Sequence, residues 1–365
     1  TLVSTPDRHL VFFGTETTIG TTSTQDDMFI RFSDQESIDS TTSYAPSATN
    51  TAGTQRLADG TRIVSAIRGR DAIYVWTDTS LFIMRFVGAP FTFSFQQVGT
   101  NCGLIGKNAA VEVDGSAYWM SENGFFRYTG KLESLACLVE DYVYDDINTV
   151  PKNHIYAGLN NLFGEVTWFY PGSGAASNNR SVTYNYMDST PERPVWTTSS
   201  LARSSWFDSS IFGKPHGTEY DSSATSDSTV GNTDGVTTYF EHETGQDQIK
   251  AGARSSIAAN IQSGDFDLDR QGLQGDGEYM MKIRRVLPDF LSQTGNARVT
   301  LNLKNYPTDS QSSSSLGPFT TTTTTTKIDT RARARAIALK VDNTSIKQHW
   351  KLGTFRLDIQ ADGRR

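Results

Sequence analysis

A short aromatic hairpin recurs along this chain and constrains its fold more than any other feature. Copies lie at residues 71–86, 116–128, 164–170 and, more weakly, 236–240. The first three copies each carry a tryptophan, and these are Trp76, Trp119 and Trp168, separated by 43 and 49 residues. Four-stranded blades of a β-propeller follow one another at about 40 to 50 residues. The spacing therefore predicts a β-propeller.

The rest of the sequence predicts an all-β protein. Short alternating runs of β-branched and aromatic residues, bounded by turn-forming residues, recur throughout, whereas helical periodicity is scarce. We assign residues 1–254 to the propeller domain, with further strands at 9–13, 28–32 and 63–67. Residues 140–147 are expected to form one short helix or an extended acidic connector. The polar stretch 199–235, with its serine-rich run 221–229, is expected to be a degenerate blade with a long surface loop.

The pattern changes near residue 252, where the aromatic hairpins stop. Longer strands are expected at 264–269, 279–286, 297–303, 334–341 and 355–359. Five such strands in roughly a hundred residues are typical of a β-sandwich, so residues 255–365 are predicted to form a second, β-sandwich domain. The seven threonines at 320–326 indicate an extended linker or an edge strand.

Composition restricts the classes of function. The 365 residues include 33 basic and 40 acidic side chains, a net charge of −7. This argues against a protein whose main work is to hold nucleic acid on a basic face, but it is compatible with a surface past which DNA slides. Two cysteines, Cys102 and Cys137, are too few for a disulfide framework, so they are expected to be small buried residues of a protein assembled in a reducing cytoplasm.

The chain is expected to have no membrane span and no signal peptide, because no apolar run is long enough and the first residues are polar. It begins at Thr1 without a methionine. This is expected of a processed chain or of the remainder of a longer one, and in the second case N-terminal blades are missing from the propeller.

Three carboxylates alternate along one expected strand. Asp265, Asp267 and Asp269 would share one face of it, and calcium binding is one hypothesis because hard cations take oxygen ligands. An EF-hand loop is excluded, since Arg270 stands where glycine is needed and Asp276 where glutamate is needed. A solvated strand face or a salt-bridged interface is the favoured interpretation.

Three arginines alternate with alanines in the strongest basic cluster of the chain. Arg331, Arg333 and Arg335 would point to one side of an extended strand. They could contact the phosphates of DNA or pair with the carboxylates of a neighbouring subunit, and in an acidic protein the second interpretation has at least equal weight.

No catalytic motif is present. The five histidines have no ligand spacing, and there is no nucleophile elbow, Walker loop or His-Glu-x-x-His motif. We expect no enzyme and no cofactor, although glycoside hydrolysis stays open because it needs only two carboxylates. The turns at 77–80 and 121–124 do not match the repeated turn of sialidase propellers.

Exposed tryptophans could instead bind carbohydrate. The candidates are Trp76, Trp119, Trp168, Trp196 and Trp206. Tryptophans at matched positions of successive blades more often pack between blades than form sugar platforms, so blade packing is favoured for the first three.

Several blocks of sequence resemble the tail nozzle of short-tailed bacteriophages, also described as the packaged-DNA stabilisation or tail tubular protein. The resemblance covers roughly residues 56–215 and 278–365. It is carried by the runs at 68–70, 75–78, 95–103, 117–120, 124–126, 283–290, 350–359 and 362–365.

The resemblance implies a virion structural protein without catalytic residues. It implies a homo-oligomer, typically a hexameric ring below the portal and adaptor, that forms the distal tube in which the genome is retained and from which it is ejected. The implied partners are the portal, adaptor and tail fibre proteins, with transient passage of double-stranded DNA, and the implied location is the virion tail, assembled in the host cytoplasm. The alternative hypothesis is a tail-associated propeller that binds or cleaves a glycan on the host surface.

Overall fold

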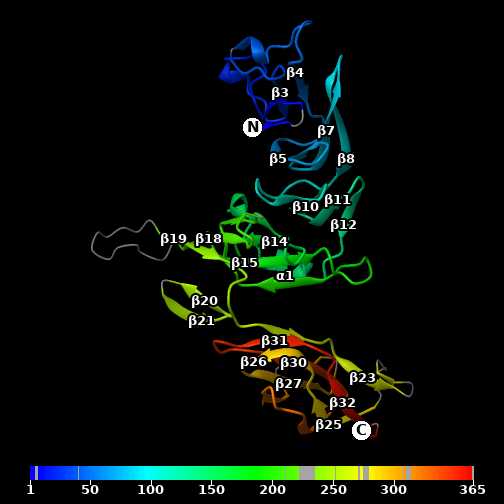
Figure 1. Cartoon of the computed structure of the whole chain (residues 1–365). Coiled ribbons are helices and arrows are strands. Elements are labelled where there is room, and N and C mark those ends of the chain that lie inside the picture. The colour runs from blue at the N-terminus through cyan, green and yellow to red at the C-terminus, as the bar shows by residue number, and fades with distance from the viewer. Residues whose placement is uncertain are drawn as a thin grey trace. The chain divides into compact units, whose positions relative to one another are not determined.

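The computed structural model describes residues 1–4, 7–39, 41–209, 211–221, 235–250, 252–269, 272–273, 279–306, 308–309 and 314–363. They form two compact units, residues 1–243 and 244–365 (Figure 1). Strands account for almost all of the regular structure, which confirms the all-β prediction. The described residues contain one α-helix, α1 (Glu140–Asp146), so the acidic segment forms the helix rather than the extended connector.

The first unit consists of five consecutive antiparallel sheets, in each of which successive strands are neighbours. Sheet 1 contains β1 (Leu2–Val3), β2 (Leu10–Phe13), β3 (Phe29–Phe32) and β4 (Gly53–Arg56). Sheet 2 contains β5 (Ile63–Arg68), β6 (Ile73–Thr77), β7 (Ser80–Gly88) and β8 (Thr92–Thr100). Sheet 3 contains β9 (Ala110–Val113), β10 (Ser116–Ser121), β11 (Gly124–Tyr128) and β12 (Leu132–Leu135). Sheet 4 contains β13 (Tyr156–Asn160), β14 (Glu165–Tyr170), β15 (Arg180–Asn185) and β16 (Trp196–Ser199).

Sheet 5 has three strands, β17 (Ser205–Phe207), β18 (His216–Asp221) and β19 (Val236–Glu241). Its first two strands lie within the stretch 199–235 predicted as a degenerate blade, and its third strand follows that stretch. All but the first residue of the serine-rich run 221–229 lie outside the described residues.

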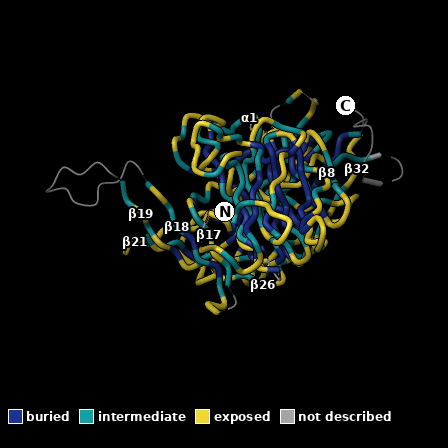
Figure 2. The backbone as a smooth tube through the Cα atoms, turned by 90° about the horizontal axis from the view of Figure 1, so that it is seen from above, coloured by how far each residue is buried: buried dark blue, intermediate teal, exposed yellow. Residues whose placement is uncertain are grey.

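Both faces of β6 in sheet 2 are buried, which explains why this strand is apolar up to its last residue. Every residue of β6 is buried. Ile73 and Val75 lie in a core shared with sheet 1, whereas Tyr74 and Trp76, on the opposite face, lie in a core shared with sheets 3 and 4. The buried residues accordingly follow the strands and the exposed ones follow the loops (Figure 2). Each sheet is stabilised by the sheets that precede and follow it.

The second unit has four sheets. The largest follows the order β24-β23-β30-β27-β28, with β22 also paired to β30, and its strands are β22 (Asn260–Gln262), β23 (Phe266–Asp269), β24 (Gly272–Leu273), β27 (Ala297–Lys304), β28 (Ser315–Thr321) and β30 (Ala336–Asp342). The three-stranded sheet follows the order β29-β25-β32 and contains β25 (Met281–Leu287), β29 (Ile328–Ala334) and β32 (Arg356–Ala361). The two remaining pairs are β26 (Phe290–Thr294) with β31 (His349–Leu352), and β20 (Asp247–Lys250) with β21 (Ala253–Ser256).

One hydrophobic core joins the two larger sheets of this unit. Ile283 of β25 and Ala332 of β29 meet Val299 of β27 and Val341 of β30 in it. The outer face of the three-stranded sheet is thereby left to solvent, and this face contains the functional candidates described below.

The boundary between the units lies after Glu243, earlier than the predicted boundary after residue 254. The hairpin β20–β21 belongs to the second unit, where the backbone N–H of Lys347 donates to the carboxylate of Asp247 at 2.7 Å. This bond joins residues 100 positions apart, so no local pattern in the sequence indicates it.

Gly103, in the connection between β8 and β9, lies where no side chain fits. A Cβ atom at Gly103 would be 2.1 Å from the backbone oxygen of Asp78. We expect Gly103→Ala to lower the free energy of unfolding by about 3 kcal/mol or more, because backbone on both sides must move. Gly264→Ala, which meets nothing within 4 Å, is the control and should have no comparable effect in urea denaturation. Equal midpoints for the two variants would contradict this.

Candidate functional site

The three tryptophans of the recurring hairpin lie inside the first unit. Trp76, Trp119 and Trp168 are each 0% exposed and belong to the second strand of sheets 2, 3 and 4. The indole N–H of Trp119 donates to the carbonyl of Cys102 at 2.7 Å. That of Trp168 donates to the carbonyl of Ala109, immediately before sheet 3, at 3.0 Å. The latter bond links sheet 4 to the backbone of the sheet before it.

The tryptophans differ in the hydrogen bonds that they make. The rings of Trp76 and Trp119 meet edge-on with centroids 5.4 Å apart, but the buried indole N–H of Trp76 has no hydrogen-bond partner among the described residues. Trp196 and Trp206 are half-buried, and their N–H groups donate to the carbonyls of Ala136 and Leu159. A fully buried indole cannot stack on a sugar, so the first three tryptophans provide no carbohydrate platform.

The described part of the predicted carboxylate row shows no group of side chains that could hold a cation. Asp265 is exposed and forms an ion pair with Lys304 at 2.6 Å, and Asp267 is half-buried in β23. The side chain of Asp269 lies outside the described residues. Among the described residues no group of three or more His, Cys, Asp or Glu side chains could hold a metal ion.

Two of the three predicted arginines share a strand face. Arg331 and Arg333 are exposed on β29 and alternate with the buried Ala332 and Ala334. Arg335 lies at the bend between β29 and β30, where its backbone N–H donates to the carbonyl of Lys304 at 3.0 Å. The predicted stripe therefore ends at Arg333.

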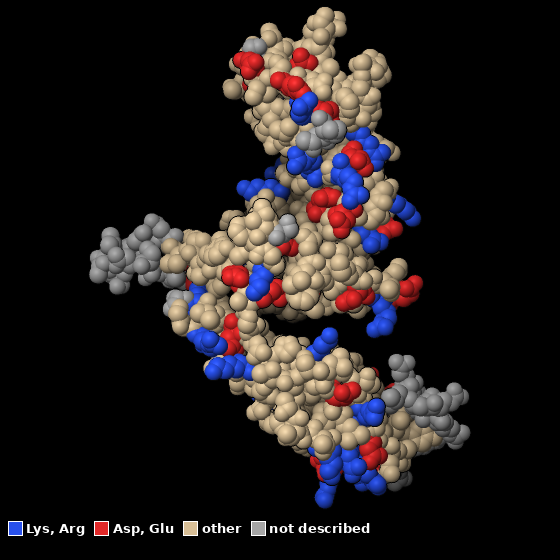
Figure 3. Space-filling model, viewed as in Figure 1, with Lys and Arg blue, Asp and Glu red and all other residues tan. Residues whose placement is uncertain are grey.

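Other basic side chains join these two on the outer face of the sheet β29-β25-β32. We define the basic face as this surface together with the residues that flank its strands. It contains Lys282, Arg284, Arg285, Lys327, Arg331, Arg333 and Arg356, with Asp329, Asp358 and Asp362 among them. Basic side chains are gathered in the part of the second unit where β25 and the C-terminus lie (Figure 3).

Strand register assembles the basic face. Lys282 of β25 lies directly opposite Arg333 of β29, and Leu287 lies opposite Arg356 of β32. The register of β25 with both neighbours shifts between Ile283 and Arg285. As a result Arg284 and Arg285 are both exposed, instead of one of them pointing into the core.

Only part of this positive charge is neutralised within the protein. Asp329 forms ion pairs with Lys327 at 2.9 Å and Arg285 at 3.1 Å, and the hydrogen bonds from these two side chains lower the pKa of the Asp329 carboxyl. Asp362 forms an ion pair with Arg333 at 2.6 Å. The four remaining cations, Lys282, Arg284, Arg331 and Arg356, have no ion pair within the described part of the chain.

Charge is divided unequally between the units. Residues 1–243 contain 15 basic and 28 acidic side chains, whereas residues 244–365 contain 18 basic and 12 acidic ones. The first unit is therefore strongly acidic and the second is basic. The net charge of −7 averages over this difference and conceals it.

A second candidate surface is aromatic. On the outer face of sheet 5, the ring centroids of Phe207 and Phe212 are 5.8 Å apart, and Phe212 contacts His216, which stacks on Tyr239. Phe207 is 54% exposed and Tyr239 is 65% exposed. We call this surface the aromatic patch.

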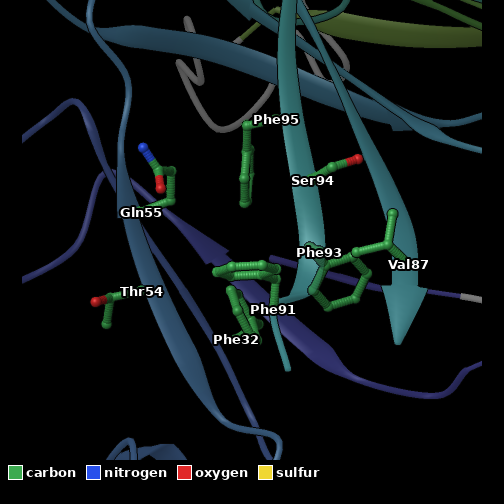
Figure 4. A pocket seen from close by; sticks show the side chains of 8 residues that line it. All are labelled: Phe32, Thr54, Gln55, Val87, Phe91, Phe93, Ser94 and Phe95. Carbon is green, nitrogen blue, oxygen red and sulfur yellow. The ribbon is translucent and has the colours of Figure 1, made fainter. Parts of the chain in front are cut away.

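A pocket of about 310 Å³ lies between the edge strands β4 and β8. Four phenylalanines converge in it (Figure 4), namely Phe32, Phe91, Phe93 and Phe95. Its polar lining is restricted to Thr54, Gln55 and Ser94, and no titratable group lines it. The pocket therefore has the chemistry of an apolar contact and not of a catalytic site.

One cluster has the geometry of a catalytic triad but not its proton arrangement. His9 Nδ1 is 3.2 Å from the Asp7 carboxylate, and His9 Nε2 is 3.1 Å from the Thr51 hydroxyl. A nucleophilic hydroxyl must donate its proton to the histidine, but Thr51 donates to Asp34 at 2.6 Å. His9 is also completely buried. The cluster is a structural network, and the sequence contains no signal for it because Thr51 is 42 residues from His9.

The two cysteines are free thiols of low acidity. Cys102 is buried and Cys137 is half-buried, and burial raises the pKa of both thiols to about 11.

No helix within the described residues is long and apolar enough to cross a membrane. No protein-family model matches the chain, and no curated protein matches it.

Proposed function

We propose that the protein is a structural subunit of a bacteriophage tail, a ring-forming nozzle in which the genome is retained and through which it is ejected. In this proposal the first unit is a β-propeller and the second a β-sandwich. The proposal includes no catalytic activity, and it places the protein in the virion tail after assembly in the host cytoplasm.

The observation that carries the proposal is the succession of meander sheets in the first unit. Sheet follows sheet along the chain, and buried tryptophans such as Trp119 and Trp168 fill the space between them. Meander sheets that follow one another along the chain are the units from which propellers are built, and a propeller suits a scaffold or conduit. The resemblance of the sequence to tail nozzles supplies the biological setting.

The aromatic patch supports assembly into an oligomer. Soluble monomers rarely expose contiguous aromatic surface, and such a surface usually marks a protein contact. We propose that a second copy of the chain covers the patch. The acidic first unit supports the conduit role, because an electronegative wall does not retain phosphate.

Electron microscopy tests the function. An antibody raised against the protein should label the tail of the virion that encodes it, and projection images of the purified protein should show a ring with rotational symmetry. A protein that is monomeric and absent from the virion would overturn the proposal.

Light scattering tests the role of the aromatic patch. We expect Phe207→Ser with Phe212→Ser to shift the protein from oligomer toward monomer while thermal stability changes little, since both side chains are more than half exposed. Leu138→Ser with Leu162→Ser replaces equally exposed apolar side chains elsewhere in the unit and should leave the mass unchanged. The same mass for both double variants would exclude the patch as the contact.

A further inference from the structure

We propose that the basic face binds the phosphate backbone of double-stranded DNA without reading its sequence. The choice of DNA as the anion rests on the proposed function, in which the genome is held within the tail. The inference adds to that function the basic face as the surface that holds the genome. The net charge of the whole protein would by itself argue against such a surface.

The first argument is the surplus of charge. Lys282, Arg284, Arg331 and Arg356 have no ion pair within the described residues, so their charge is available to an external anion. The carboxylates of Asp329 and Asp362 are neutralised by neighbouring cations and add little repulsion. Seven basic and three acidic side chains leave the basic face positive overall.

The second argument is geometry. Alternate residues of a strand are about 7 Å apart and neighbouring strands about 5 Å apart, so the cations form a two-dimensional array. B-DNA presents one phosphate per roughly 1.7 Å of helix axis, and such an array can engage several phosphates at once. A sheet face that contacts the backbone with long side chains positions DNA but carries no base-reading element in a groove.

The third argument is the segregation of charge. Basic residues exceed acidic ones only in the second unit, while the first unit has nearly twice as many acidic as basic residues. Charge asymmetry between the halves of a chain is typical of proteins in which one half contacts a polyanion. The second unit is therefore the part of the chain suited by its charge to contact DNA phosphates.

The test is the salt dependence of binding by the full chain to a fluorescein-labelled 20-base-pair duplex, measured by anisotropy. If the four unpaired cations reach phosphates, the logarithm of the association constant should fall against the logarithm of salt concentration with a slope of about −3.6, which is about 150-fold between 50 and 200 mM NaCl. A duplex of scrambled sequence should bind equally well.

The test variant replaces these four side chains by glutamine, as Lys282→Gln, Arg284→Gln, Arg331→Gln and Arg356→Gln. It should lose most of the slope. The matched control replaces three arginines and one lysine of the first unit that are exposed and have no ion pair within the described residues, as Arg62→Gln, Arg85→Gln, Lys107→Gln and Arg193→Gln. The control should keep the slope. Circular dichroism of both variants checks that they fold.

Equal slopes for the test and control variants would overturn the proposal. So would a test variant that binds DNA normally but has a changed oligomeric mass, because the basic face would then be a contact with an acidic protein surface. The outcomes separate this proposal from the proposed function. A ring in the virion without salt-dependent DNA binding contradicts only the basic face, and salt-dependent binding by a protein absent from any virion contradicts only the tail assignment.

Discussion

Replacing Trp168 by alanine is expected to lower the free energy of unfolding of the first unit by about 3–5 kcal/mol, the cost of a large cavity in a packed core. Trp168 is completely buried, and its ring lies 4.9 Å from that of Phe125 in sheet 3 and stacks on Trp196 in its own sheet. Sheets 3 and 4 both lose contacts, so the effect spreads along the unit. Urea denaturation followed by circular dichroism measures it, and a loss of this size is a large part of the stability of an ordinary domain.

Two further variants separate packing from surface effects. Trp168→Phe keeps an aromatic ring but removes the N–H that donates to Ala109, and should cost about 0.5–1.5 kcal/mol for the lost hydrogen bond, because the Ala109 carbonyl still accepts from the backbone N–H of Met120 at 3.1 Å. Phe163→Ala, at a half-exposed position of the turn between β13 and β14, is the control and should cost less than either. If Trp168→Ala were no more harmful than Phe163→Ala, the tryptophan would not hold the sheets together.

The sequence predicted the local structure well, because local structure follows from residues close in the chain. The recurring hairpins are strands β6–β7, β10–β11, β14 and β19, and the expected strand at 63–67 is β5. Both cases depend on alternation and turn residues within about ten positions. The burial of Trp76, Trp119 and Trp168 follows from the same pattern, since aromatic residues in apolar strands rarely face water.

The basic face could be predicted only in part. Arg331 and Arg333 were recognised because they alternate along one strand. Lys282 and Arg284 come from β25 and Arg356 comes from β32, 72 residues beyond Arg284 in the chain, and only the register of β25 with its two neighbours aligns them with Arg331 and Arg333. Periodicity within a strand contains no information about which strands pair, so the sequence could not indicate this surface.

The net charge of the whole chain also failed to indicate the basic face, because it averages over both units. A net charge of −7 would describe a chain that is acidic throughout, but the two units have net charges of opposite sign. The boundary that separates them was expected near residue 254, where the aromatic pattern ends, whereas the contact of Asp247 with Lys347 places the hairpin β20–β21 in the second unit.

A buried arginine, Arg203, lies just before the first strand of sheet 5, and its surroundings make the stability of the first unit sensitive to pH. Arg203 is 3% exposed, and burial lowers the pKa of its guanidinium to about 10. Its cation lies over the Phe240 ring at 4.1 Å and is 3.5 Å from the Glu219 carboxylate. Its Nε–H donates to Nε2 of His242 at 2.9 Å, so this nitrogen must be unprotonated.

We expect the first unit to lose about 2 kcal/mol of stability through His242 as the pH falls from 7 to 4.5, a figure reduced for solvent screening at this half-buried group. Burial, followed by the charge of Arg203, lowers the pKa of His242 to about 4, whereas in the unfolded chain the imidazole has its ordinary pKa of 6.5. Above pH 6.5 the imidazole is neutral in both states and the contribution is complete. Between pH 6.5 and 4 only the unfolded state gains a proton, so the folded state loses stability as the pH falls through this window.

His242→Gln keeps an acceptor for Arg203 and cannot titrate, so its urea midpoint should depend less on pH than that of the unmodified protein. The same pH dependence in both proteins would show that other groups, chiefly carboxylates, account for the acid sensitivity.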